Sequence, residues 1–278
     1  MKKFTVISLL CLVFLSGCGY GVRYVVSKTL YQGGQAFDET PEERGLDYVV
    51  AEFKNTDGNT LHGWLIPGKE GYPLIIYFHG NISNVTHGLE KIETLNSLGF
   101  SVFSFEYRGY GQSEGRPLYE DDFYRDAQSA LWWLHRRGWD SSKIIYYGHS
   151  LGAAVALNLA LEEPPAGVIL ESAFTSYAGM LKDKAPFLYM LGGWKAREFS
   201  NISKVPKLKS PIILFHGTSD LIVPSQMSQR LYDAAQPPKK LYLVDGANHV
   251  NTLYLAREGL AKDLEMFLPD RGSTVSFQ

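Results

Sequence analysis

Short apolar runs and longer segments with helical spacing alternate along this chain from about residue 46 onward. Residues 73–78 are a continuous apolar run, as is typical of a strand that is covered on both faces, and residues 101–107 are the next expected strand. Residues 85–98 and 120–137 instead carry apolar side chains at helical intervals. This alternation predicts an α/β fold with a mostly parallel sheet of about eight strands flanked by helices.

The same patterns predict the remaining elements. A turn signal at 55–59 separates two strand-like segments, so we expect these to form a hairpin. The further strands are expected at 46–54, 61–66, 143–147, 168–170, 212–215 and 241–244, and the further helices at 153–160 and 252–267.

Residues 173–210 break the alternation and are rich in large apolar side chains. We expect a small cap inserted over the carboxyl ends of the strands, where sites on such sheets lie. Its apolar residues could form a wall for an acyl or aryl group, or could pack the cap onto the main body. A patch that faces a membrane is a third interpretation.

The first eighteen residues have the composition of a targeting segment. Lys2 and Lys3 precede an apolar stretch at 4–15 that is too short to span a bilayer comfortably. Leu15-Ser16-Gly17-Cys18 follows and resembles the lipobox of bacterial lipoproteins, which implies that Cys18 is acylated and becomes the mature N-terminus. An ordinary secretory signal and a single membrane anchor are the alternatives.

The targeting segment predicts a membrane-anchored lipoprotein of the bacterial cell envelope. Gly19 stands where an aspartate could retain the protein in the inner membrane, which favours the outer membrane if the cell is Gram-negative. We expect a signal at 1–18, a tether with weak local structure at 19–43, the main domain at 44–268 and a tail at 269–278.

Composition limits the function classes. The 278 residues are 45% hydrophobic and 20% charged, which suits one large domain. The net charge is −2 and basic residues form no aromatic-interleaved patch, so we expect no nucleic-acid partner. Cleavage at the lipobox leaves Cys18 as the one cysteine, which excludes an internal disulfide and a cysteine-based zinc site. No His, Asp and Glu pattern predicts another metal site.

Gly148-His149-Ser150-Leu151-Gly152 carries the strongest chemical signal. It follows an expected strand and precedes an expected helix, which is the context of a nucleophile elbow. The elbow presents Ser150 at the tip of a sharp turn, where its flanking positions crowd against backbone and favour glycine. A chance match is the alternative, because the pattern fixes only three positions.

Ser150 needs a base and an acid that orients the base. His249 lies on the loop after the last expected strand, and Asp220 follows the strand before it. Along the chain the three residues follow in the order Ser, Asp, His, which is the order expected for a catalytic triad whose serine lies on a nucleophile elbow. Glu171, at the end of another strand, is the alternative acid, whereas we expect Asp245 to structure its loop.

Two backbone N–H groups should stabilise the oxyanion, those of Leu151 and Asn81. Asn81 lies in the loop that begins His79-Gly80, and we expect His79 to shape this loop. Two other histidines have expected non-catalytic positions: His216 packs or hydrogen-bonds in its own loop, and His149 points away from the reacting centre. The glycine-rich stretch at 107–115 is expected to support the site.

Together these motifs resemble the α/β-hydrolase superfamily, and more narrowly the Bem46-like group of serine hydrolases, over about residues 46–267. The resemblance implies the triad Ser150, Asp220 and His249 and no cofactor. Relatives include esterases and thioesterases, and similar domains are described as serine-aminopeptidase-like. The lipobox departs from cytosolic relatives, so their substrates need not transfer.

Three functions follow as hypotheses. The first is a membrane-anchored hydrolase of carboxylic esters or thioesters with a small-molecule or lipid-like acyl substrate. The second is a peptidase or amidase, because the same triad can deliver a proton to an amine leaving group. The third is a non-catalytic envelope lipoprotein on a hydrolase scaffold, since a fold alone does not prove activity.

Overall fold

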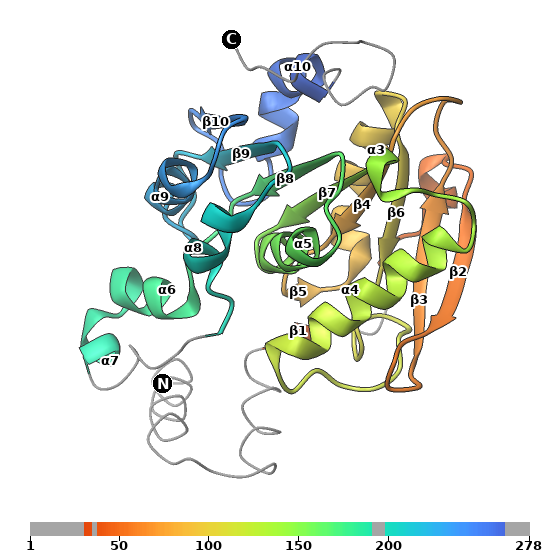
Figure 1. Ribbon diagram of the computed structural model, residues 1–278, viewed down its shortest axis with the longest axis horizontal. Coiled ribbons are helices and arrows are strands. Elements are labelled where there is room, and N and C mark those ends of the chain that lie inside the picture. The colour runs from red at the N-terminus through yellow and green to blue at the C-terminus, as the bar shows by residue number, and fades with distance from the viewer. Residues whose placement is uncertain (1–30, 35–37, 191–197, 265–278) are drawn as a thin grey trace.

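The computed structural model describes residues 31–34, 38–190 and 198–264. Within these residues the main sheet has eight strands, in the order β10-β9-β8-β7-β4-β6-β3-β2 (Figure 1). β2 pairs antiparallel with β3, as does β3 with β6, and the other neighbours are parallel. The strands are β2 (Val49–Lys54), β3 (Thr60–Ile66), β4 (Leu74–Phe78), β6 (Ser101–Phe105), β7 (Ile144–His149), β8 (Gly167–Glu171), β9 (Ile212–Gly217) and β10 (Lys239–Val244).

The predicted fold is confirmed, and its core explains the sequence pattern. All five residues of the central strand β4 are buried, because helices cover both faces of the sheet. Successive side chains point to opposite faces, so Ile76 and Phe78 join one core cluster and Ile75 and Tyr77 the other. The helices are α3 (Leu89–Ser97), α4 (Glu120–His135), α5 (Leu151–Glu162), α9 (Gln226–Ala234) and α10 (Thr252–Leu264).

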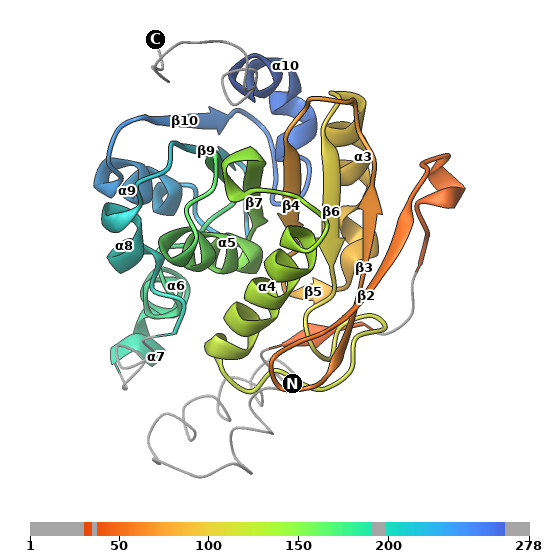
Figure 2. The ribbon, with the colours of Figure 1, turned by 45° about the vertical axis from the view of Figure 1, so that its right-hand side comes forward.

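These helices divide between the two faces of the sheet. α4 and α5 cover the face that Ile76 and Phe78 occupy, and α3 and α10 cover the other (Figure 2). The expected helix at 85–98 begins with a 3₁₀ turn, η2 (Val85–Gly88), before α3. The sequence patterns missed α9. None of the described helices combines the length and apolarity that crossing a bilayer requires.

The expected cap lies between β8 and β9. Its described part contains α6 (Tyr177–Lys184), α7 (Pro186–Met190), α8 (Asn201–Lys204) and the 3₁₀ turn η5 (Val205–Lys207). α6 and α7 extend beyond the same end of the sheet as β5 (Ile82–Ser83) (Figure 1). The cap is therefore placed at the carboxyl ends of β4 and β7.

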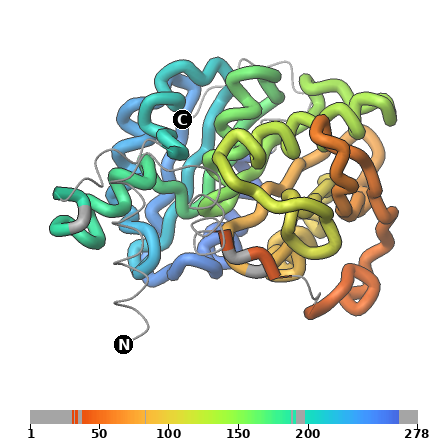
Figure 3. Tube along the Cα trace, turned by 90° about the horizontal axis from the view of Figure 1, so that it is seen from below, coloured from red at the N-terminus to blue at the C-terminus, as the bar shows by residue number. Residues whose placement is uncertain are grey.

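One boundary differs from the sequence prediction. Residues expected to be a weakly structured tether include β1 (Gln32–Gly33), which pairs parallel with β5 (Figure 3). Tyr31 before it is only 8% exposed and packs edge-on against Phe123. A Cβ at Gly33 would lie 2.8 Å from the Gly109 carbonyl oxygen, so only glycine fits this approach. The expected signal at 1–18, with Cys18, and the tail at 269–278 lie outside the described residues.

Candidate active site

Ser150 lies at the sharp turn between β7 and α5. Its backbone has φ 55° and ψ −113°, a conformation that a residue other than glycine rarely adopts. Backbone atoms crowd both flanking glycines. A Cβ added at Gly148 would lie 2.3 Å from the Gly152 carbonyl oxygen, and a Cβ added at Gly152 would lie 1.9 Å from the Phe78 carbonyl oxygen. The Ser150 N–H donates to the Glu171 carbonyl at 2.9 Å, which anchors the turn to β8.

The structure brings Asp220 and His249 together. His249 Nδ1 lies 2.7 Å from Asp220 Oδ2, and because a carboxylate only accepts, Nδ1 carries the proton. His249 Nε2 is then the basic nitrogen. Ser150 and His249 line the same cavity, although no hydrogen bond joins their side chains in the described residues. Such bonds are often longer in unliganded enzymes than in the Michaelis complex.

Hydrogen bonds keep Asp220 ionised. Its Oδ1 accepts the backbone N–H groups of Ile222 at 2.8 Å and Val223 at 2.9 Å. Burial acts to raise the pKa of Asp220, but the bonds from His216, His249 and the Val223 backbone outweigh it and hold the pKa well below its usual range. A permanent carboxylate can orient the His249 ring and stabilise its charged form.

His216 supports the same carboxylate, which the sequence patterns did not indicate. Its Nε2 lies 3.1 Å from Asp220 Oδ2 and 3.0 Å from the Val223 carbonyl oxygen. Both partners accept, so Nε2 carries a proton and donates. Its Nδ1 lies 2.7 Å from Ser228 Oγ. His216 therefore bonds within its own loop, as expected, and also fixes Asp220.

Glu171, the alternative acid, does not contact His249. It is fully buried and accepts hydrogen bonds from Lys91 Nζ at 2.7 Å and Tyr147 Oη at 2.8 Å. Burial acts to raise the pKa of Glu171, but the charge and hydrogen bond of Lys91 outweigh burial and lower it. Asp245 accepts a bond from Thr218 Oγ1 at 3.2 Å, in line with a role in its loop.

The expectation that His149 points away from the reacting centre is wrong. Its Nε2 donates to the His249 backbone oxygen at 2.9 Å, and the two ring centroids lie 4.9 Å apart. Burial lowers the pKa of His149 to about 4, so the ring is neutral at pH 7. The turn at Ser150 sends this side chain toward the loop of His249, which a linear pattern does not reveal.

The expected oxyanion loop, residues 79–83, borders the nucleophile. A Cβ built at Gly80 would lie 3.6 Å from Ser150 Cβ, and Asn81 and Leu151 line the cavity. Tyr110 Oη donates to Asn81 Oδ1 at 2.9 Å. The roles of the Asn81 and Leu151 N–H groups stay predictions.

His79 stabilises this loop through contacts with Gly80 and Tyr107. Its ring lies against Tyr107, with centroids 4.4 Å apart, and its Nδ1 donates to the Gly80 carbonyl at 2.8 Å. Its Nε2 lies 3.3 Å from Glu106 Oε2. These contacts support the expected shaping role of His79.

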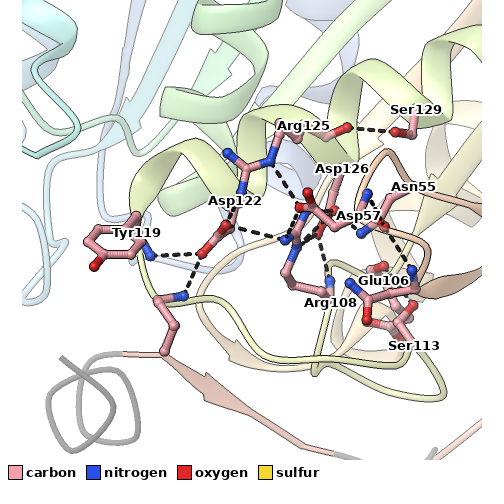
Figure 4. Close-up of polar contacts among 12 residues, drawn as sticks. Asn55, Asp57, Glu106, Arg108, Ser113, Tyr119, Asp122, Arg125, Asp126 and Ser129 are labelled. Carbon is pink, nitrogen blue, oxygen red and sulfur yellow. Dashed lines mark hydrogen bonds and ion pairs between the residues drawn. The ribbon is translucent and has the colours of Figure 1, made fainter. Parts of the chain in front are cut away.

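A buried ion-pair cluster ties the glycine-rich stretch to α4 (Figure 4). Arg108 Nη2 donates to Asp126 Oδ1 at 2.7 Å, and the Arg108 N–H donates to Asp126 Oδ2 at 2.8 Å. Asn55 in the β2–β3 turn donates to the same carboxylate at 2.7 Å. The cluster joins three segments that are distant in sequence, which is the supporting role expected of 107–115.

The cavity over Ser150 has a volume of about 350 Å³. Phe174, Tyr177 and Met180 from the cap line this cavity and also pack against the core. Their role as a wall for an acyl or aryl group stays a prediction. Among the described residues, no group of three His, Cys, Asp or Glu side chains is arranged to hold a metal ion.

Comparisons with known proteins identify relatives of this chain. A family model described as "Serine aminopeptidase, S33" matches residues 71–206. The uncharacterized protein Rv2307c of Mycobacterium tuberculosis is 38% identical over 208 residues, 74% of this chain and 72% of that protein. Protein bem46 of Schizosaccharomyces pombe is 32% identical over 245 residues, 80% and 79% of the two chains.

Solved structures show the same fold. The esterase Pf2001 of Pyrococcus furiosus superposes with a TM-score of 0.68 at 22% identity, over 86% of this chain and 97% of that one. Because relatives above 30% identity span more than two thirds of both chains, the chain belongs to the α/β-hydrolase superfamily, in the group that includes bem46.

Proposed function

We propose that this protein is a serine hydrolase that cleaves carboxylic esters or thioesters through an acyl-enzyme on Ser150. The observation that carries the proposal is the Asp220–His249 pair, joined at 2.7 Å, whose histidine lines one cavity with a serine on a strained elbow. His249 takes the Ser150 proton as Oγ attacks the carbonyl carbon, and then gives it to the leaving oxygen or sulfur.

The oxyanion would be held by the N–H groups of Leu151 and Asn81. Each such donor contributes about 3 kcal/mol to stabilising the transition state. Water activated by His249 then attacks the acyl carbon and releases the acid. The mostly apolar lining of the cavity, with no Asp or Glu among its described residues, suits a neutral acyl group.

A peptidase or amidase is the second candidate, since the matching family model bears the description "Serine aminopeptidase". Parallel rates on an acyl ester and on an aminoacyl amide of the same size separate the two. We favour the ester because a free amino terminus needs an acidic partner.

We also propose that acylation of Cys18 anchors the protein in the bacterial envelope. The support is the order of Lys2 and Lys3, the apolar stretch at 4–15 and the lipobox-like Leu15-Ser16-Gly17-Cys18.

A fluorophosphonate probe tests the catalytic proposal. The probe reacts with an activated serine, so we expect wild type to be labelled and Ser150→Ala not to be. Ser203→Ala, at an exposed serine of α8, is the matched control and should label like wild type. A folded wild type that stays unlabelled would favour a non-catalytic scaffold instead.

A further inference from the structure

The cavity lining includes three polar residues that the proposed chemistry does not use, Tyr77, Lys91 and His149, which we call the polar lobe. Tyr77 packs in the core cluster on the α3 face of the sheet, and Lys91 lies in α3 itself. The apolar cap residues Phe174 and Met180 also line the cavity, but they pack against the opposite core cluster. The polar and the apolar parts of the lining therefore come from opposite faces of the sheet.

Tyr77 brings a hydroxyl group into the lobe. The residue is 1% exposed and lines the cavity, and among the described residues no hydrogen bond to its hydroxyl is found. Burial raises the pKa of Tyr77 well above its usual value, so the hydroxyl keeps its proton and can both donate and accept. Tyr147 packs beside the Tyr77 ring at 5.4 Å, and a Cβ at Gly88 would lie 2.3 Å from it, which fixes its position. A ligand or a water in the cavity would complete the hydrogen bonding of this hydroxyl.

Lys91 and His149 add a donor and an acceptor. Lys91 Nζ donates to Glu171 Oε1 and to the Val250 carbonyl, both at 2.7 Å, which leaves a third N–H. His149 Nε2 donates to the His249 backbone, so its Nδ1 carries a lone pair. A Cβ at Gly80 would lie 3.2 Å from this Nδ1, which places it against the oxyanion loop.

This set of groups selects a neutral ligand. The Glu171 carboxylate offsets the Lys91 charge, and the His149 lone pair would repel an anion. A hydroxyl group matches the lobe because it donates and accepts, as Tyr77 does. The lobe also borders Val250, next to the histidine that must protonate the leaving oxygen.

We propose that this lobe is a leaving-group subsite for a hydroxyl-bearing alcohol, so that the substrate class is an ester of a polyol. The proposal rests on the esterase function proposed above. The acyl chain lies toward the cap, and the polyol hydroxyls bond Tyr77 Oη and the third N–H of Lys91. An ordered water in the lobe is the competing occupant.

Two esters that differ only in the hydroxyls of the alcohol test the subsite: glycerol monobutyrate and propyl butyrate. We expect the full chain in detergent to have the higher kcat/KM for glycerol monobutyrate. Tyr77→Phe removes one hydroxyl with the ring kept, so the ratio of the two kcat/KM values should fall about three- to tenfold, as expected for one hydrogen bond. Tyr146→Phe, at a buried tyrosine of β7 outside the cavity lining, should leave the ratio unchanged.

The outcomes separate the two proposals. A ratio that does not fall in Tyr77→Phe, or a wild type that does not prefer the glycerol ester, overturns the subsite and leaves the esterase standing. Hydrolysis of neither ester by wild type, or equal hydrolysis by Ser150→Ala, overturns the esterase proposal itself. Thermal unfolding of both tyrosine variants checks that their folds are intact.

Discussion

Asp220 shows how single residues set the chemistry of this site. Its two oxygens accept bonds from two backbone N–H groups and two histidines, so the carboxylate needs no water to remain charged. His249 is thereby held in one tautomer. His149 fixes the same residue from its other side, because its Nε2 donates to the backbone oxygen of His249, and burial keeps the His149 ring neutral.

This neutrality predicts a pH dependence of stability. The pKa of His149 is about 4 in the folded protein and about 6.5 when exposed, so the unfolded chain binds more protons between these values. The folded state therefore loses stability as pH falls from 6.5 toward 4, by about 3 kcal/mol from this group. His149→Gln keeps a donor for the His249 oxygen and should remove this loss.

Urea unfolding of wild type and His149→Gln at pH 7 and pH 4 measures how much unfolding free energy each protein loses between the two pH values. His87→Gln, at a histidine whose side chain is 56% exposed, controls for the change in histidine number. If wild type and His149→Gln lose the same unfolding free energy between the two pH values, burial of a neutral His149 is not the cause.

At the scale of elements, the junction of β7 and α5 is built on close backbone approach. Gly152 lies in the first turn of α5, next to the Phe78 carbonyl at the end of β4. The absence of a side chain there lets α5 start close to the oxyanion loop. This contact sets the position of Ser150 relative to the neighbouring strand. A larger side chain must move either α5 or β4.

Gly152→Ala should therefore destabilise the fold, although alanine is the better helix former. Its Cβ would meet the Phe78 oxygen at 1.9 Å, and overpacking of this kind costs about 1–3 kcal/mol or more. Gly259→Ala in α10 is the matched control: its Cβ would lie 3.3 Å from the Tyr242 ring edge, a contact that a shift of a few tenths of an ångström relieves, so it should be less destabilising than Gly152→Ala. Equal midpoints of urea unfolding for the two variants would contradict this account.

At the scale of the whole molecule, the proposed anchor and the proposed catalytic residues lie in separate parts of the chain. The proposed anchor is Cys18, whereas the triad lies between residues 150 and 249. We expect Cys18→Ser to leave the membrane fraction of bacterial cells without losing fluorophosphonate labelling. Membrane flotation followed by probe labelling measures both properties, with Ser27→Ala, outside the lipobox-like segment, as the control. A Cys18→Ser protein that still floats with membranes would point to another anchor.

The sequence predicted the large elements because their patterns are long. β4 and β7 are continuous apolar runs, and the elbow motif lies between a clear strand and a clear helix. β1 is two residues long and forms only through its pairing with β5, so it is too short for any periodic pattern of apolar residues to indicate it. His216 and Lys91 likewise acquire their roles from partners that only the folded chain brings near.

The short pairing of β1 with β5 gives the amino-terminal end a mechanical connection to the catalytic loop. β5 directly follows the residues expected to bind the oxyanion, and the Gly34 carbonyl also accepts the Gly111 N–H at 2.8 Å. Tension along a membrane tether would reach this two-residue ladder before it reaches the main sheet. A shortened protein that starts after Gly34 would keep its triad residues but lose the pairing of β1 with β5 and the Gly34–Gly111 hydrogen bond.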